Sequence, residues 1–186
     1  MVRGTTPIPF IYRRAGKVGG KLGPRMRDIT FKPIGVIHSP FKQQDSTPVQ
    51  PAYACGAEGS LELEPAYAGA LKDLEGFERI WILYHLDRAG PYPPLVVPYM
   101  DDARHGLFAT RAPSRPNPIG ISVVTLVSVK ENRVEVRGLD ILDETPLLDI
   151  KPYVPEFDAV FPSRAGWFDA SRTARRTADS RFGNDD

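Results

Sequence analysis

Nineteen prolines and sixteen glycines divide the 186-residue chain into short segments, and this interruption limits its regular structure more than any other feature. Proline removes a backbone hydrogen-bond donor, and both residues favour turns, so long helices are disfavoured. Between these breaks, six to eight short stretches show the apolar patterns of strands, and no strand-helix unit repeats. We therefore predict a mainly β protein, a single small β-barrel with one or two short helices.

The strand patterns are clearest in the middle of the chain. Residues 60–64 alternate regularly, with Leu61 and Leu63 on one face. Residues 65–76 form the best short helix pattern, because Pro65 suits a first turn and Gly76 can end it. Further strands are expected at residues 29–37, 79–85, 106–110, 120–129 and 134–142.

Charge is distributed unevenly along the chain. Residues 1–27 carry seven basic and no acidic residues, residues 28–162 carry twelve basic and nineteen acidic, and residues 163–186 carry five and four. We expect a basic N-terminal arm, a barrel domain over residues 28–162 and a C-terminal tail. A basic arm can follow a phosphate backbone, but a solvated tail explains the same charges, and both interpretations stay open.

Cysteine, histidine and apolar content narrow the protein class. The chain has one cysteine, Cys55, which rules out an intrachain disulfide framework and fits a reducing, cytoplasmic location. We expect Cys55 to be an inert thiol and not a nucleophile. The three histidines lack metal-ligand spacing, so we expect no metal. No stretch approaches the roughly 20 apolar residues of a membrane-spanning helix, so we expect no membrane partner.

The most unusual segment is T-R-A-P-S-R-P-N-P-I-G at residues 110–120. Its three prolines fix the backbone before any ligand arrives, which lowers the ordering cost of binding. Arg111 and Arg115 are then able to present guanidinium groups to a carboxylate or phosphate. The simpler alternative is that this segment is a rigid connection between two strands and that its arginines are merely exposed.

A second polar pattern lies in L-D-I-L-D-E-T-P-L-L-D-I-K-P-Y at residues 139–153. In an extended stretch, Asp149, Lys151 and Tyr153 share one face, and Leu148 and Ile150 share the other. A carboxylate, an ammonium and a phenol on one surface suit acid-base or anchoring work. A surface ion pair of small energetic effect fits the same pattern.

These two segments, together with I-G-V-I-H-S-P-F at residues 34–41, resemble the TrmO family, also called TsaA or YaeB-like. They occur in the family's order and cover about residues 29–160. The resemblance implies an S-adenosylmethionine-dependent tRNA methyltransferase on a β-barrel, which methylates N6 of threonylcarbamoyladenosine at position 37, next to the anticodon of threonine tRNA. It also implies a homodimer with the cofactor cleft near the subunit interface, and activity without a metal.

The resemblance also implies particular site residues. The expected cofactor contacts are Pro48, Gln50, Asp87, Arg88, Arg111, Ile121, Gly138, Leu139 and Asp140. Two positions depart from the family pattern, since Val49 replaces a usual arginine and Glu144 a common glycine. The arginines expected to help hold tRNA from the C-terminal tail are Arg164, Arg172, Arg175, Arg176 and Arg181.

The reaction itself suggests the remaining roles. Adenine N6 is a poor nucleophile, and carbamoylation makes its N–H more acidic, so a base or acceptor is useful. Our candidates are Asp149 and Tyr153, with Asn117 as an amide acceptor and Lys151 as partner for a substrate carboxylate or phosphate. This requires the arginine loop and the Asp149 edge to lie together, within one chain or across subunits. A methyltransferase with another RNA or small-molecule acceptor, and a non-catalytic cofactor-binding module, stay open as alternatives.

Overall fold

The computed structural model describes residues 28–45, 47–54, 56–161, 163–171 and 176–183. The predicted arm at residues 1–27 and Cys55 lie outside these residues. The chain divides into two units, residues 1–32 and 33–186. In the first unit, the described residues 28–32 have no regular secondary structure, and everything that follows concerns the second unit.

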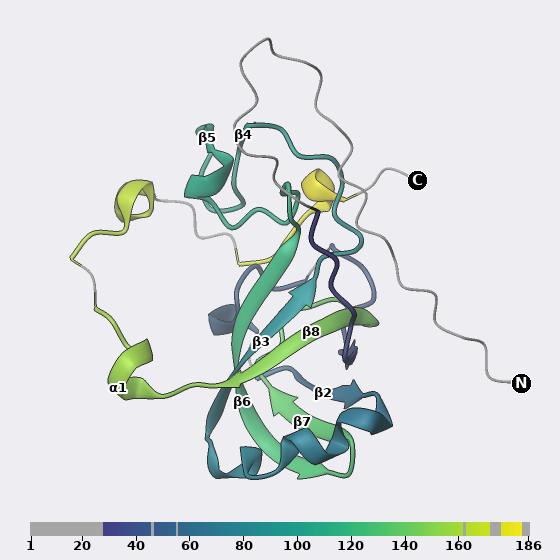
Figure 1. Cartoon of the computed structure of the whole chain (residues 1–186). Helices are drawn as coiled ribbons and strands as arrows, with labels where there is room; N and C mark the ends of the chain where they lie inside the picture. Colours follow the sequence, from purple (N-terminus) through teal and green to yellow (C-terminus); the bar gives the residue numbers. More distant parts are fainter. Residues whose placement is uncertain (1–27, 46, 55, 162, 172–175, 184–186) are drawn as a thin grey trace, which may run out of the picture. The chain divides into compact units, whose positions relative to one another are not determined.

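Six antiparallel strands close a barrel in the order β1-β2-β7-β6-β3-β8, with β8 pairing back to β1 (Figure 1). The strands are β1 Gly35–His38, β2 Glu58–Leu63, β3 Arg79–His85, β6 Ile119–Lys130, β7 Arg133–Arg137 and β8 Thr145–Pro152. The predicted mainly β barrel is therefore confirmed.

Alternation along the strands builds the barrel core. In β3, Ile80 and Ile82 are fully buried, whereas Trp81 between them is only partly covered. Ile82 pairs with Ser122 of β6 and with Ile150 of β8, so inward positions from three strands meet. The strand predicted at residues 79–85 is confirmed at its full length, because a continuous apolar run suits a strand with neighbours on both sides.

Four predicted elements are wrong in kind or extent. The strand predicted at residues 134–142 ends at Arg137, because Gly138 adopts a φ of 90° and turns the chain. Residues 65–76 form two 3-10 segments, η2 Pro65–Leu71 and η3 Leu74–Gly76, because Asp73 between them adopts a left-handed φ of 66° that an α-helix cannot contain. The first strand begins only at Gly35, since Pro33 has no N–H to pair. The strand predicted at residues 106–110 contributes only to β5, and a 3-10 turn follows.

A β-bulge alters the predicted faces of β8. Asp149 pairs with Leu83 and Leu147 pairs with Tyr84, so Leu148 has no opposite residue. The bulge turns Leu147 into the core, where it is fully buried, in place of the predicted Leu148. Beyond the bulge, the predicted alternation of Asp149, Lys151 and Ile150 holds.

Beyond the barrel strands lies a second, smaller assembly, which we call the loop layer and define as residues 86–118 and 176–183. It contains β4 Leu95–Val96 paired with β5 His105–Gly106, and the turns η4 Leu107–Ala109 and η6 Ser180–Phe182. Figure 1 shows β4, β5 and the yellow turn of η6 beyond the same end of β6. Its own core consists of Val96, Leu107, Ala112 and Phe182.

The remaining regular segments are short. They are η1 Pro51–Tyr53, α1 Pro155–Asp158 and η5 Gly166–Ala170. Within the described residues, none of the helices has the length and apolar character needed to span a bilayer.

Candidate functional site

A cleft of about 1350 Å³ lies where the loop layer meets the barrel. Its walls come from residues 47–53, the start of β6, the turn after β7, the loop around Arg111 and the C-terminal segment. Pockets for single small ligands usually enclose roughly 300–1,000 Å³. The cleft is therefore large enough for a cofactor and part of a second molecule.

Eight of the nine predicted cofactor contacts line this cleft. They are Pro48, Gln50, Asp87, Arg88, Arg111, Ile121, Gly138 and Asp140. Leu139 differs, because its side chain is fully buried in the barrel core with Ile141 and Leu147 and does not line the cleft. Residues from segments far apart in the sequence thus converge on one cavity.

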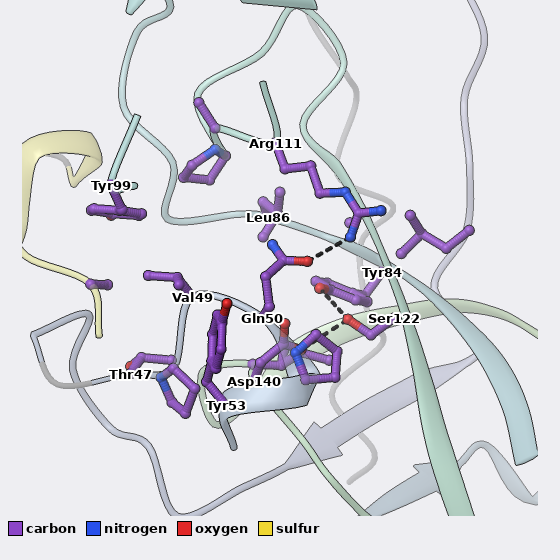
Figure 2. Close-up of a pocket in the computed structure, with 18 of the residues that line it drawn as sticks. Thr47, Val49, Gln50, Tyr53, Tyr84, Leu86, Tyr99, Arg111, Ser122 and Asp140 are labelled. Carbon is purple, nitrogen blue, oxygen red and sulfur yellow. Dashed lines mark hydrogen bonds between the residues drawn. The ribbon is translucent and has the colours of Figure 1, made fainter. Parts of the chain in front are cut away.

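The floor of the cleft holds a chain of three polar side chains, shown in Figure 2. Ser122 donates a hydrogen bond of 2.8 Å to Asp140 Oδ1, and the Ser122 and Tyr84 hydroxyls are 3.0 Å apart. Burial raises the pKa of Asp140 to about 6, and burial also raises the pKa of Tyr84 well above its usual range. The carboxylate is thus able to accept hydrogen bonds from hydroxyl or amino donors of a ligand.

Two glycines shape this floor. A Cβ on Gly120 would lie 2.1 Å from the Tyr84 ring, so only glycine lets the phenol rest against β6. Gly138 adopts a φ of 90°, which ends β7 and turns the chain toward Asp140. Both glycines are needed to present the polar chain to the cleft.

The two loop arginines have different roles. Arg111 is exposed and donates to Gln50 Oε1 at 2.5 Å, so its guanidinium faces the cleft across from Asp140 (Figure 2). Arg115 instead donates to the carbonyl oxygens of Thr110 at 2.9 Å and Ala112 at 3.3 Å, which braces its own loop. The prediction that both arginines present their guanidinium groups to a ligand is supported by the structure only for Arg111.

The cleft is positively charged in an acidic body. The charged side chains among its described lining residues are Arg79, Arg88, Arg111, Arg115, Arg137, Asp87 and Asp140. Residues 28–162 as a whole carry seven more acidic than basic residues. Five arginines line the cleft with two aspartates, and Arg137 and Arg79 are paired with Glu58 at 2.9 Å and Glu78 at 3.8 Å outside the lining. Such a local excess attracts anionic ligands and raises their concentration at the site.

The C-terminal segment holds one wall of the cleft. Val49 N donates to Arg176 O at 3.0 Å, and Ala178 N donates to Thr47 O at 2.8 Å, so this segment pairs with the loop that carries Pro48 and Gln50. The Gln44 amide adds hydrogen bonds of 2.8 Å to Tyr99 Oη and 2.7 Å to the carbonyl of Asp179.

The predicted tail arginines have distinct surroundings. Arg176 lies over the Tyr53 ring at 5.6 Å, and Arg181 pairs with Asp179 at 2.8 Å. Arg164 is exposed, and Arg172 and Arg175 lie outside the described residues. A contact of these arginines with tRNA stays a prediction.

The predicted catalytic edge lies beside the cleft, on the outer face of the barrel. Asp149 pairs with Leu83, which pairs with Ile121 of the cleft, so Asp149 is two strands, or about 10 Å, from the cleft wall. Lys151 Nζ lies 2.8 Å from Asp149 Oδ2, and the Tyr153 ring is 5.7 Å from that of Trp81. The arginine loop leads into β6 and this edge lies along β8, so strand β3 separates the two elements.

None of the four catalytic candidates lines the cleft itself. Lys151 lines a separate groove of about 540 Å³ with Trp81, Pro152 and Phe157, and Ile121 lies at the boundary of the two cavities. Asn117 is exposed, and its backbone carbonyl accepts from Ile119 N at 2.8 Å. Catalytic roles for these side chains remain predictions.

Several site residues were not predicted from the sequence. They are Tyr53, Tyr84, Tyr99, Phe108, Ser122 and Trp167, all of which line the cleft. Ser122 had a detectable pattern, because it is a polar residue at an inward position of a strand whose other inward residues include Val124 and Leu126. The others resemble ordinary core aromatics in sequence.

Comparisons with known proteins agree with this arrangement. Residues 36–159 match the family described as the tRNA-methyltransferase O N-terminal domain. A probable S-adenosyl-L-methionine-binding protein of Pyrococcus abyssi is 51% identical over 156 residues, which cover 83% of this chain and 85% of that protein. The tRNA (adenine(37)-N6)-methyltransferase of Escherichia coli is 38% identical over 159 residues, covering 80% and 68%.

A solved structure gives the same relationship. The crystal structure of TrmO from Pseudomonas aeruginosa superimposes with a TM-score of 0.65 at 40% identity, covering 76% of this chain and 62% of that chain. This chain thus spans less than two thirds of the solved TrmO. With the matched domain extending over most of the barrel, the chain belongs to the TrmO family.

Proposed function

We propose that this chain is an S-adenosylmethionine-dependent methyltransferase that acts on N6 of threonylcarbamoyladenosine at position 37 of tRNA. The observation that carries the proposal is the convergence of eight family contact positions on one arginine-rich cleft with a partly buried carboxylate at its floor. The Escherichia coli relative, named for methylation of adenine 37 in tRNA, supports the acceptor.

The cleft contains groups suited to the cofactor. When bound, S-adenosylmethionine supplies a methyl group activated by a sulfonium. Asp140 would accept hydrogen bonds from hydroxyl or amino groups of the cofactor. Arg111, which donates a hydrogen bond to Gln50, would pair with the carboxylate of the cofactor. The main task of these side chains is alignment, which lowers transfer barriers by roughly 7–11 kcal/mol in favourable cases.

The acceptor needs a group that takes up the N6 proton. Our candidates are Asp149 on β8 and Tyr153 directly after it, and Lys151 between them is the candidate partner for a substrate carboxylate or phosphate. The arginines of the cleft, Arg88 and Arg111 among them, suit a threonylcarbamoyl group, which carries a carboxylate of its own.

A homodimer completes this arrangement. The outer face of β6 exposes Ile119 at 39%, Ile121 at 53% and Val127 at 49%, and Ile121 in this apolar strip lines both cavities. A second copy packed on this strip covers it and brings another Asp149 edge toward the cleft. Light scattering with wild type and Ile121→Glu tests the point, and we expect a dimer for wild type and a monomer for the variant.

Nucleoside mass spectrometry tests the reaction. Threonine tRNA with and without the threonylcarbamoyl group is incubated with enzyme and cofactor, then digested. We expect a methyl group on N6 of the carbamoylated nucleoside only, and loss of product with Asp140→Ala. Methylation of unmodified A37 contradicts the carbamoyl requirement, whereas cofactor binding without transfer to either tRNA supports the non-catalytic alternative.

A further inference from the structure

We propose that an aromatic rim on the cleft, formed by Phe108, Trp167 and Phe168 together with Arg115, is the platform on which unpaired bases next to the target nucleotide stack. The inference rests on the proposed function, because it names the surface that holds the RNA during that reaction. The three rings and Arg115 all line the same cleft as the cofactor positions.

Phe108 is the most exposed aromatic side chain of the cleft, with 79% of its surface accessible. It lies on the short turn η4, whose neighbour Leu107 is anchored in the small core of the loop layer. The Arg115 guanidinium lies 5.7 Å from the Phe108 ring centroid and is itself tied to the carbonyls of Thr110 and Ala112. The cation and the ring are thus held close together without a ligand.

Trp167 and Phe168 extend this surface from the C-terminal half of the chain. Trp167 Nε1 donates to Ala109 O at 2.7 Å, directly beside Phe108. Its ring stacks on His105 at 4.6 Å and 19°, and His105 Nε2 is 2.9 Å from Asp101 Oδ2. Phe168 meets Trp167 edge-on at 6.0 Å and remains 45% exposed. A ring fixed by a hydrogen bond and by stacking pays little ordering cost on binding.

The charge beside the rim favours RNA over other partners. Exposed aromatic rings alone fit an apolar protein surface equally well. Here the rim opens into a cleft whose arginines outnumber its aspartates by three, and one of those arginines lies on a rim ring. Aromatic faces for bases and guanidinium groups for phosphates are the combination that binds single-stranded nucleic acid. The sequence-tolerant nature of stacking suits the loop nucleotides around a single target base.

Fluorescence anisotropy with a labelled anticodon stem-loop RNA tests the rim. Phe108→Ala is expected to weaken RNA binding about tenfold, since a base stacked on an aromatic ring contributes an effect of that order. Phe108→Tyr keeps the ring and is expected to restore binding. Phe161→Ala is the matched control, because Phe161 is 96% exposed but does not line the cleft. Calorimetry is expected to give the wild-type S-adenosylmethionine affinity for Phe161→Ala, whose side chain lies outside the cleft.

Trp167→Phe provides a second variant, which removes the bond to Ala109 but keeps a ring, and it is expected to weaken RNA binding less than Phe108→Ala. If Phe108→Ala binds RNA with wild-type affinity, the proposal that the rim binds RNA bases is wrong. A change of oligomeric state in that variant also contradicts the proposal, because it would assign Phe108 to a protein interface. If wild type methylates tRNA and Phe108→Ala binds it normally, the rim alone is wrong. If Phe108→Ala loses RNA affinity but wild type transfers no methyl group, the rim stands and the proposed function is wrong.

Discussion

The barrel and the loop layer are stabilised in different ways. Fourteen buried residues form the barrel core, and eleven of them lie on strands that pair on both sides. The loop layer has a core of four, and much of its order comes from single hydrogen bonds, such as those from Gly90 N and Ser114 Oγ to Phe182 O. Because the cleft lies between them, its floor belongs to the more stable barrel and the wall that carries Arg111 belongs to the less stable loop layer. Stability and ligand binding should therefore respond to different substitutions.

The largest effect is expected in the barrel. Ile82→Ala removes a fully buried side chain from a position where three strands meet, and such losses cost about 2–5 kcal/mol in free energy of unfolding. Val36→Ala on the outer face of β1 is the control, with a cost below about 1 kcal/mol. Urea denaturation measures both, and equal costs would remove the distinction between inner and outer faces.

Phe182→Ala is expected to break the loop layer without unfolding the barrel. The variant leaves a cavity among Val96, Leu107 and Ala112, and it loosens the segment that pairs with Thr47 and Val49. We expect S-adenosylmethionine affinity to fall at least tenfold, while the urea midpoint of the barrel changes little. A loss of barrel stability as large as that of Ile82→Ala would show that the two regions unfold together.

Asp140 lies on the floor of the cleft, and its titration predicts how the free energy of unfolding changes with pH. Its folded pKa of about 6 exceeds the ordinary 3.8, so between these values the folded chain holds a proton that the unfolded chain has released. The contribution of Asp140 to the free energy of unfolding therefore falls as pH rises toward about 6. Its total change between the two pKa values is about 3 kcal/mol.

Asp140→Asn removes this dependence. The free energy of unfolding of the variant relative to wild type should rise by up to about 3 kcal/mol between about pH 4 and pH 7. Parallel denaturation series at several pH values measure it. A difference that stays constant with pH would show that the pKa of Asp140 is not raised in the folded chain.

The smallest effect concerns the turn before β8. Glu144 adopts a φ of 63°, a left-handed conformation that costs most residues roughly 1–2 kcal/mol, and this explains why glycine suits the position. Glu144→Gly relieves that strain but loosens the unfolded chain, so we expect a gain of about 1 kcal/mol or less. Thermal denaturation tests it, with Glu131→Gly at a second left-handed position as a comparison. A clear loss of stability would contradict this account of the turn.

The sequence predicts the barrel better than the cleft, for physical reasons. Strand β3 is predicted to the residue because its apolar run is a local property of the chain. The bulge at Leu148 and the 3-10 turns at residues 65–76 depend on pairing and packing that local patterns do not contain. The pairing of Pro48 with Thr177 joins residues 129 positions apart, so it could not be foreseen. Eight cofactor positions were reached through family resemblance, whereas Tyr84 and the aromatic rim were not.

Hydrogen–deuterium exchange with and without S-adenosylmethionine tests the central claim that the cofactor occupies the cleft between barrel and loop layer. We expect protection at residues 47–53, 109–112 and 138–141, with little change at residues 61–71. Protection confined to the outer groove at Lys151 and Phe157 would contradict it.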